Sequence, residues 1–203
     1  MKIPPQKEVW DSIAEEWFKF KKESGEKNIA FVNKQEGKIL DLGCGAGRNF
    51  NPDIKAEIYA LDFSPEMIKY AKKKSKKIKL KKIKFFISDA AKLPFEDNFF
   101  DSIICIALLH CIPSKSRRKK VMKEMFRVLK KGKIAKIAVW NKNSTRFKNK
   151  KKEDFVSWRD KGKRYYYFYE EKEIKKELRE AGFKIKKIVA GREFPNITLI
   201  VKK

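Results

Sequence analysis

A glycine-rich turn near the start of the chain has the residue types of a ligand cradle. Residues 37–49 read Gly-Lys-Ile-Leu-Asp-Leu-Gly-Cys-Gly-Ala-Gly-Arg-Asn, so a short apolar run leads into Gly43, Gly45 and Gly47. Glycine has no Cβ, so the backbone can turn sharply there and a ligand can approach it closely. The spacing is tighter than the Gly-x-Gly-x-x-Gly of dinucleotide-binding folds. Taken alone, the turn also fits a plain loop or another nucleotide site.

The surrounding pattern supplies the elements that would hold this turn. Short apolar runs at 38–42, 57–61, 84–87, 101–108 and 133–140 predict strands. Helical spacing predicts helices over 7–22, from Ser64-Pro65 onward, over 115–129 with Gly132 as its stop, and over 170–181. Strands that alternate with helices predict right-handed crossovers and a doubly wound sheet. Two later strands, 184–190 and 196–201, follow a polar stretch over 141–163 and suit a closing antiparallel hairpin.

Two further acids follow predicted strands, where such sheets bind their ligands. Asp62 ends the second strand, and Asp89 follows the third. Either acid alone could be a helix cap or a surface charge. Both acids at strand ends, together with Asp41 before the glycine turn, resemble the cofactor site of class I S-adenosylmethionine (SAM) methyltransferases.

Two further segments of the sequence resemble these methyltransferases. Residues 61–67 read Leu-Asp-Phe-Ser-Pro-Glu-Met and residues 89–95 read Asp-Ala-Ala-Lys-Leu-Pro-Phe, as these enzymes do after their second and third strands. The resemblance covers about residues 37–140. It implies a Rossmann-like α/β fold with a mostly parallel seven-stranded sheet, helices on both faces and a C-terminal antiparallel hairpin. It also implies SAM as the cofactor and leaves the substrate open.

The same resemblance implies roles for individual residues. The glycine turn would lie under the methionine part and the ribose of SAM, and Asp62 would accept both ribose hydroxyls. Asp89 would reach the adenine amino group, and Ile106 would face the methionine end. The cofactor-binding residues implied in this way are Asp41, Gly43, Gly45, Gly47, Asp62, Phe63, Asp89, Ala90 and Ile106.

The second half of the chain resembles the tRNA wobble-uridine carboxymethyl methyltransferases. This family includes the methyltransferase domain that is fused to an AlkB-type tRNA hydroxylase. The matching segments are 106–111 (Ile-Ala-Leu-Leu-His-Cys), 116–118 (Ser-Arg-Arg), 138–140 (Ala-Val-Trp), 154–158 (Asp-Phe-Val-Ser-Trp) and 164–169 (Arg-Tyr-Tyr-Tyr-Phe-Tyr). The resemblance implies esterification of 5-carboxymethyluridine at the first anticodon position, with tRNA as the partner. It also implies a small zinc-binding activator subunit, paired along a sheet edge.

A carboxylate acceptor fits the residues of this chain. A carboxylate is already an ionised nucleophile near neutral pH, so it needs placement against the methyl group rather than a strong base, and proximity can supply ~7–11 kcal/mol. Candidates to orient it are His110, the only histidine, and Arg164 with Tyr165, which would hold the carboxylate or stack on the flipped base. His110 could equally be a hydrogen-bonded core residue, and the run 165–169 could be strand or helix-face packing.

One segment departs from the pattern of the family. A Thr-Arg and a Pro-Trp-Pro element usually follow the first helix, whereas residues 18–26 here read Phe-Lys-Phe-Lys-Lys-Glu-Ser-Gly-Glu. This region is expected near the substrate, so the exact uridine substituent stays open.

Length and charge narrow the class of partner. The 203 residues predict one domain, with a helical cap over 1–36, a cofactor core over 37–140 and a substrate-side region with closing strands over 141–203. Lys and Arg number 52 against 26 for Asp and Glu, a net charge of +26. An AT-rich genome or hot growth would raise Glu along with Lys, so the imbalance favours a polyanionic partner, most often nucleic acid.

Cysteine usage and the absence of an apolar leader predict a cytoplasmic protein. Cys44, Cys105 and Cys111 form no Cys-x-x-Cys pair, so we expect neither a disulfide nor a metal site from this chain alone.

The main alternative function is a small-molecule SAM methyltransferase of the ubiquinone-biosynthesis type, because such enzymes share the region 37–140. The net charge and the tail from residue 155 to 169 argue against it. The glycine turn and both acids argue against a non-catalytic RNA-binding module.

Overall fold

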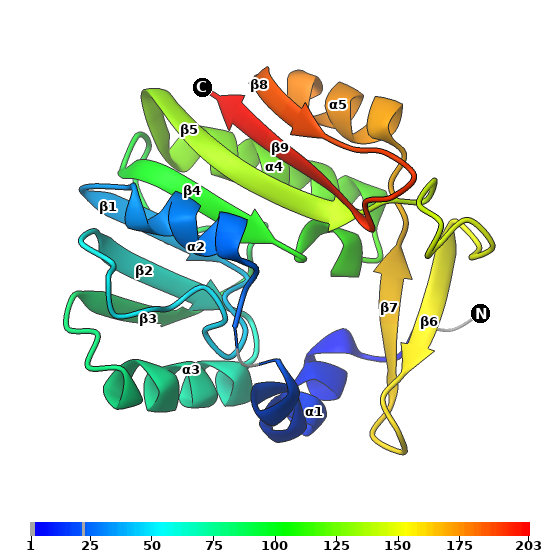
Figure 1. Ribbon diagram of the computed structural model, residues 1–203, viewed down its shortest axis with the longest axis horizontal. Helices are drawn as coiled ribbons and strands as arrows, with labels where there is room; N and C mark the ends of the chain where they lie inside the picture. The colour runs from blue at the N-terminus through cyan, green and yellow to red at the C-terminus, as the bar shows by residue number, and fades with distance from the viewer. Residues whose placement is uncertain (1–2, 22) are drawn as a thin grey trace.

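A seven-stranded sheet forms the centre of the protein. The computed structural model describes residues 3–21 and 23–203 and orders the strands β3-β2-β1-β4-β5-β9-β8 (Figure 1). The strands are β1 (Lys38–Leu42), β2 (Glu57–Asp62), β3 (Ile83–Ile87), β4 (Phe100–Ile106), β5 (Leu129–Trp140), β8 (Lys184–Val189) and β9 (Asn196–Lys202). β1 to β5 are parallel, and β9 runs antiparallel to both of its neighbours. This arrangement confirms the predicted fold class and its C-terminal antiparallel hairpin.

Helices cover both faces of the sheet, and each face has its own hydrophobic core. α2 (Glu26–Asn33) and α3 (Pro65–Lys77) pack on one face, where Ile39, Ile58 and Ile104 are buried. α4 (Lys115–Val128) and α5 (Glu171–Glu180) pack on the other, against Leu40 and Ile103. Because both faces are covered, the inner strands are buried along almost their whole length.

The remaining elements gather at the end of the sheet where the parallel strands finish. α1 (Gln6–Phe20) and the hairpin of β6 (Glu153–Ser157) and β7 (Lys163–Tyr167) lie there together in Figure 1. A short 3-10 helix, η1 (Leu109–Cys111), follows β4 on the same side. The strand order reverses between β1 and β4, which is where a doubly wound sheet opens a crevice for its ligand.

Several predicted boundaries are confirmed and others are corrected. Ser64 caps α3 by accepting a 3.0 Å hydrogen bond from the backbone N–H of Met67, with Pro65 at the first helical position. The prediction that Gly132 stops a helix is wrong. β5 already begins at Leu129, which pairs with Phe100, so Gly132 lies inside the strand at a φ of +76°.

Other differences concern whole elements. α2 was not predicted, and β6 lies inside the stretch that was expected to be only polar. For the tyrosine run over 165–169 the sequence allowed either a strand or the packed face of a helix, and the structure shows that the run begins inside the strand β7. The last residue of the helix predicted over 7–22 lies outside the described residues.

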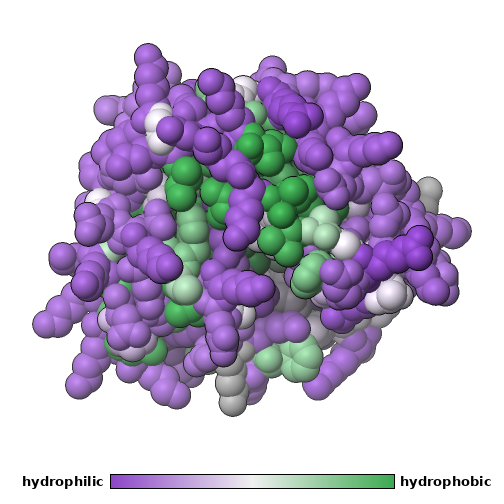
Figure 2. All heavy atoms as spheres, turned by 45° about the horizontal axis from the view of Figure 1, so that its top comes forward, coloured by the Kyte–Doolittle hydropathy of each residue, from purple (hydrophilic) through white to green (hydrophobic). Residues whose placement is uncertain are grey.

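The surface reflects the composition. Hydrophilic side chains cover most of the face shown in Figure 2, and hydrophobic residues gather near the middle of that view. None of the helices in the described part of the chain is long and apolar enough to cross a membrane. Within residues 3–21 and 23–203, no three His, Cys, Asp or Glu side chains are placed to hold a metal ion.

Candidate active site

A cavity of about 480 Å³ opens at the carboxyl ends of β1, β2 and β4. Its size lies within the roughly 300–1,000 Å³ that is usual for ligand pockets. Its floor comes from the strand ends, and part of its wall comes from Trp10 and Trp17 of α1. The predicted residues that line it are Gly43, Gly45, Asp62, Phe63, Asp89, Ala90 and Ile106.

The glycine turn has the conformation and the space of a ligand cradle. Gly43, Gly45 and Gly47 have backbone φ angles of +72°, +52° and +83°, and residues other than glycine rarely adopt positive φ angles. A Cβ on Gly43 would lie 2.9 Å from the Cβ of Leu108, and one on Gly47 would lie 2.5 Å from a ring carbon of Phe50. A Cβ on Gly45 would meet nothing closer than 4.0 Å. Gly45 therefore faces open cavity, whereas Gly47 is fixed by packing and lies outside the lining.

Asp62 joins the end of β2 to the glycine turn. Its carboxylate accepts hydrogen bonds from the backbone N–H of Gly45, at 2.8 Å, and of Ser64, at 3.0 Å. Burial raises the pKa of Asp62 to about 6, although these N–H groups oppose the change. The carboxylate still lines the cavity with acceptor capacity left over, which suits a ribose hydroxyl pair.

Asp41 lies beneath the turn instead of on the cavity surface. It is 2% exposed, one carboxylate oxygen accepts a 3.0 Å hydrogen bond from Asn49, and the other has no partner among the described residues. Burial raises the pKa of Asp41 to about 7, and the hydrogen bond from Asn49 opposes this. The predicted direct contact of Asp41 with the cofactor stays a prediction.

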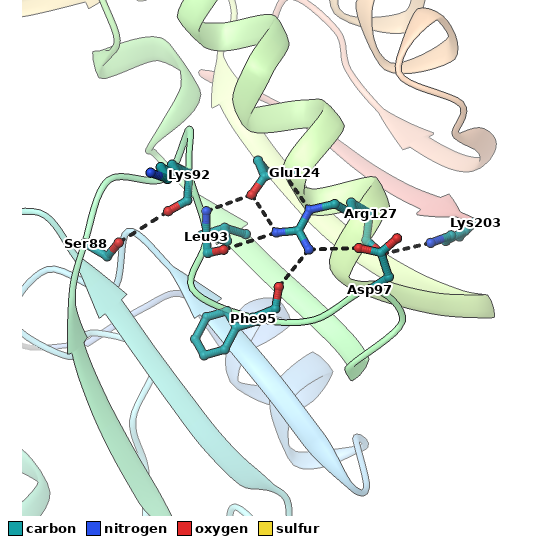
Figure 3. Close-up of polar contacts among 8 residues, drawn as sticks. All are labelled: Ser88, Lys92, Leu93, Phe95, Asp97, Glu124, Arg127 and Lys203. Carbon is teal, nitrogen blue, oxygen red and sulfur yellow. Dashed lines mark hydrogen bonds and ion pairs between the residues drawn. The ribbon is translucent and has the colours of Figure 1, made fainter.

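The wall that follows β3 is held in place from α4. Asp89 lies at the cavity mouth and pairs with Arg117 at 2.7 Å. The loop beyond it is fixed by Arg127, which donates hydrogen bonds to the carbonyls of Phe95, at 2.7 Å, and Leu93, at 3.1 Å (Figure 3). Figure 3 also shows Glu124 and Asp97, both of which pair with Arg127. These contacts fix the wall of the cavity that follows β3.

His110 is a core residue beside the cavity. It is 1% exposed and does not line the cavity, and its Nδ1 accepts a 3.0 Å hydrogen bond from the backbone N–H of Trp140, whose ring stacks on it. Burial lowers the pKa of His110 to about 3, so the imidazole is neutral. The prediction that His110 orients a substrate carboxylate is thus restricted to a hydrogen bond donated by Nε2, because the ring carries no positive charge.

Arg164 carries a buried charge without a counter-ion. It is 6% exposed, donates a 2.6 Å hydrogen bond to the hydroxyl of Tyr166, and forms no ion pair with any described residue. Its Nε has no hydrogen-bond partner in the described part of the chain. The guanidinium carbon lies 4.9 Å from the ring centre of Trp158 and 5.3 Å from that of Trp17. Since Trp17 lines the cavity, Arg164 stands directly behind its wall.

Tyr165 points away from Arg164, because neighbouring side chains of a strand face opposite sides. Its hydroxyl donates a 3.3 Å hydrogen bond to the carbonyl of Pro113, and its backbone N–H donates one of 2.8 Å to Gln6. The structure therefore does not bring the two predicted substrate residues together on one surface.

Cavity residues to which the sequence assigned no binding or catalytic role include Trp10, Trp17, Arg48 and Arg117. The two tryptophans are seven positions apart, which places them on one side of a helix. That spacing is the signal that could have identified a wall. For the two arginines, no local pattern distinguishes them from the other basic residues.

The parallel order of β1 to β5, the glycine turn and the carboxylate at the end of β2 define an α/β domain that binds a nucleoside-containing cofactor. A family model described as a methyltransferase domain matches residues 33–182. The chain belongs to this family of methyltransferases, and SAM is its cofactor.

Named relatives include enzymes of tRNA modification. The chain is 31% identical over 134 residues to tRNA (carboxymethyluridine(34)-5-O)-methyltransferase of Arabidopsis thaliana, a match that covers 65% of this chain and 31% of the plant protein. It is 28% identical over 120 residues to probable tRNA methyltransferase 9B of Mus musculus, covering 59% of this chain and 25% of that protein. The chain thus spans a third or less of the length of both relatives.

Solved structures agree on the fold. A SAM-dependent methyltransferase from Methanosarcina mazei has a TM-score of 0.72 at 21% identity, covering 89% of this chain and 98% of that one. A structure of the Haloferax volcanii Trm112 methyltransferase activator in complex with the putative methyltransferase matches with a TM-score of 0.73 at 17% identity, covering 99% and 97%.

Proposed function

We propose that this methyltransferase esterifies the carboxylate of a 5-carboxymethyl-type uridine at the wobble position of tRNA. The observation that carries the proposal is the buried guanidinium of Arg164 behind the cavity wall, which has no carboxylate partner among the described residues. A buried charge without a counter-ion is costly, and a substrate carboxylate is the counter-ion that a guanidinium binds best. The names of the relatives and the net charge of +26 support tRNA as the carrier of that carboxylate.

The site is built to place a nucleophile that is already ionised. SAM supplies an electrophilic methyl group when it is bound. Neither His110 nor Cys111 is available as a general base here, because burial lowers the pKa of the imidazole to about 3, which makes it a weak base, and raises the pKa of the thiol, which keeps it protonated. We propose that Arg164 orients the carboxylate while Trp10 and Trp17 exclude water from the cavity. Positioning of this kind replaces general-base catalysis.

The reaction is tested by incubating the protein with labelled SAM and bulk tRNA, followed by nucleoside analysis. We expect label in a methyl ester that alkali releases. Label on a base nitrogen or carbon would keep the cofactor and reject the reaction. Label in a small organic acid or lipid, with none in tRNA, would favour a small-molecule acceptor.

Arg164 is tested by replacement with methionine. Loss of a charge-assisted hydrogen bond costs about 1.5–3 kcal/mol, so Arg164→Met should reduce kcat/KM for tRNA by about 10- to 150-fold while SAM affinity, measured by calorimetry, stays unchanged. Arg192→Met replaces an exposed arginine on the turn after β8 and serves as the matched control. Equal effects of both substitutions would show that only general charge is being measured.

We further propose a small zinc-binding activator subunit as a protein partner. β3 is an edge strand of the sheet, so one side of its backbone is open to pairing, and it carries Ile87, which is 57% exposed. Co-expression with an activator of the Trm112 type should raise solubility and activity. If the chain alone is soluble, monomeric and fully active, this part of the proposal fails.

A further inference from the structure

Four aromatic side chains form a row from the cavity wall to the surface. Ring centres are 5.2 Å apart between Trp10 and Trp17, 5.5 Å between Trp17 and Trp158, and 5.6 Å between Trp158 and Phe20. We call these four residues the aromatic row. Its inner end lines the cavity. Its outer end, Phe20, is 65% exposed, more than any other large hydrophobic side chain among the described residues.

The outer part of the aromatic row is fixed before any ligand arrives. Nε1 of Trp158 donates a 2.7 Å hydrogen bond to Glu16 of α1. The same carboxylate pairs with Arg159, at 3.3 Å, and with Lys161, at 2.9 Å, on the turn between β6 and β7. Phe20, the last residue of α1, packs edge-on against the ring of Trp158. A rigid aromatic surface of this kind binds a ligand at low cost in conformational entropy.

Cations without ion-pair partners among the described residues lie near this surface, with Lys21 over Phe20 and Arg164 over Trp158. Nζ of Lys21 lies 4.7 Å from the ring centre of Phe20. Lys21, Arg48, Arg146 and Arg164 form no ion pair within the described part of the chain. Burial lowers the pKa of Lys21, and the charges of the three arginines lower it further, so these four cations lie within electrostatic reach of one another. Exposed aromatic rings among cations are the combination that binds unpaired bases and their phosphates.

We propose that Phe20 and Trp158 form a stacking platform for an unpaired nucleobase of the substrate RNA, outside the cavity. The inference rests on the proposed tRNA function and adds a second base-binding place beside the one that receives the methyl group. A flipped base in the cavity has a neighbour on the same strand, and the aromatic row offers that neighbour an exposed ring at the outer end of a surface that begins at the cavity wall. An apolar protein surface could also cover Phe20, but it would leave the exposed side of the platform, with Lys21 beside it, without an anion.

The test measures binding of a fluorescent anticodon stem-loop RNA by anisotropy at one fixed salt concentration. Because stacking on one aromatic side chain is sequence-tolerant and substantial, Phe20→Ala should raise the dissociation constant by about 5- to 150-fold. Phe20→Tyr keeps a ring and should bind within about twofold of the wild type. Phe194→Ala removes another exposed phenylalanine, 37% exposed on the turn before β9, and should leave binding unchanged.

A duplex of the same stem without a loop completes the experiment, because it offers no unpaired base. Phe20→Ala should leave duplex affinity and SAM affinity unchanged. An unchanged dissociation constant for the loop RNA would overturn the platform, and so would an equal loss on the duplex. If Phe20→Ala weakened assembly with a protein partner and left RNA binding intact, the surface would be a protein contact and the proposal would be wrong. Ester formation on bulk tRNA by the wild type is read separately, so the reaction and the platform can fail independently.

Discussion

Lys136 is a buried lysine whose replacement by methionine should stabilise the protein. It lies on β5, is 5% exposed, and donates a hydrogen bond from Nζ to the main-chain carbonyl of Lys27 on α2. Its ammonium also lies 5.6 Å from the ring centre of Phe31. Burial, and then the nearby charge of Lys27, lower the pKa of Lys136 from 10.5 to about 8. Methionine keeps most of the side-chain volume and carries no charge to bury.

The size and sign of the effect follow from this pKa. At about 1.4 kcal/mol for each unit of pKa, the charge opposes folding by at most about 3 kcal/mol, and the lost hydrogen bond offsets roughly 1.5 kcal/mol of the gain. Below pH 8 the Lys136 amine is protonated in both the folded and the unfolded state, so folding bears the full cost of burying its charge. Between about pH 8 and 10.5 the amine keeps its proton only in the unfolded state, so the free energy of unfolding of the wild type rises with pH.

Urea unfolding of the wild type and of Lys136→Met at several pH values provides the assay. At pH 7 the variant should be more stable by about 1–2 kcal/mol, and this advantage should shrink through pH 8 to 10.5. Lys27→Ala keeps the main-chain carbonyl and removes only a neighbouring charge, so it should produce a much smaller change. A difference between wild type and Lys136→Met that does not vary with pH would refute the reasoning, because the ammonium would then be solvated.

Three further substitutions test the cofactor site and its support. Gly43→Ala places a Cβ 2.9 Å from Leu108 at a φ of +72°, so SAM affinity measured by calorimetry should fall at least about tenfold. Asp62→Asn removes a carboxylate whose pKa burial raises to about 6, so the melting temperature should hold or rise while SAM affinity falls; a lower melting temperature would contradict this. Arg118 is 1% exposed, donates to two carbonyls and stacks 3.8 Å from the ring centre of Tyr167, so Arg118→Lys should cost about 2–3 kcal/mol in urea unfolding.

The sequence predicts the parallel half of the fold well because its signals are local. The strands β1, β2, β3 and β4 are short apolar runs, and Ser64 with Pro65 marks a helix start. α2 escapes such reasoning because Gly25 precedes it without a side-chain cap and only Val32 is buried. β6 is half-exposed and pairs only with β7, away from the main sheet, so its stability depends on a partner that local pattern does not specify.

The floor of the site could be predicted residue by residue, whereas for the wall the sequence predicted only a helical cap over 1–36. Strand ends of a parallel sheet converge by topology, so the glycine turn and Asp62 meet as expected. The wall depends on contacts between α1 and β7, far apart in the chain. His110 shows the same limit, since nothing nearby in the sequence indicates that the N–H of Trp140 occupies its Nδ1.

The contacts between α1 and the β6–β7 hairpin also impose an order on biosynthesis. Gln6 bonds to Tyr165, Ser12 to Lys161 and Glu16 to Trp158, across 159, 149 and 142 positions of the chain. During synthesis α1 therefore leaves the ribosome well before the β6–β7 hairpin that contacts its tryptophans. A nascent chain that stops after β5 already holds every strand end of the cavity floor, with α1 bonded to Ser64 through Asp11, but it lacks Trp158, against which Trp17 packs. The cavity therefore gains this part of its wall only after the hairpin has been synthesised.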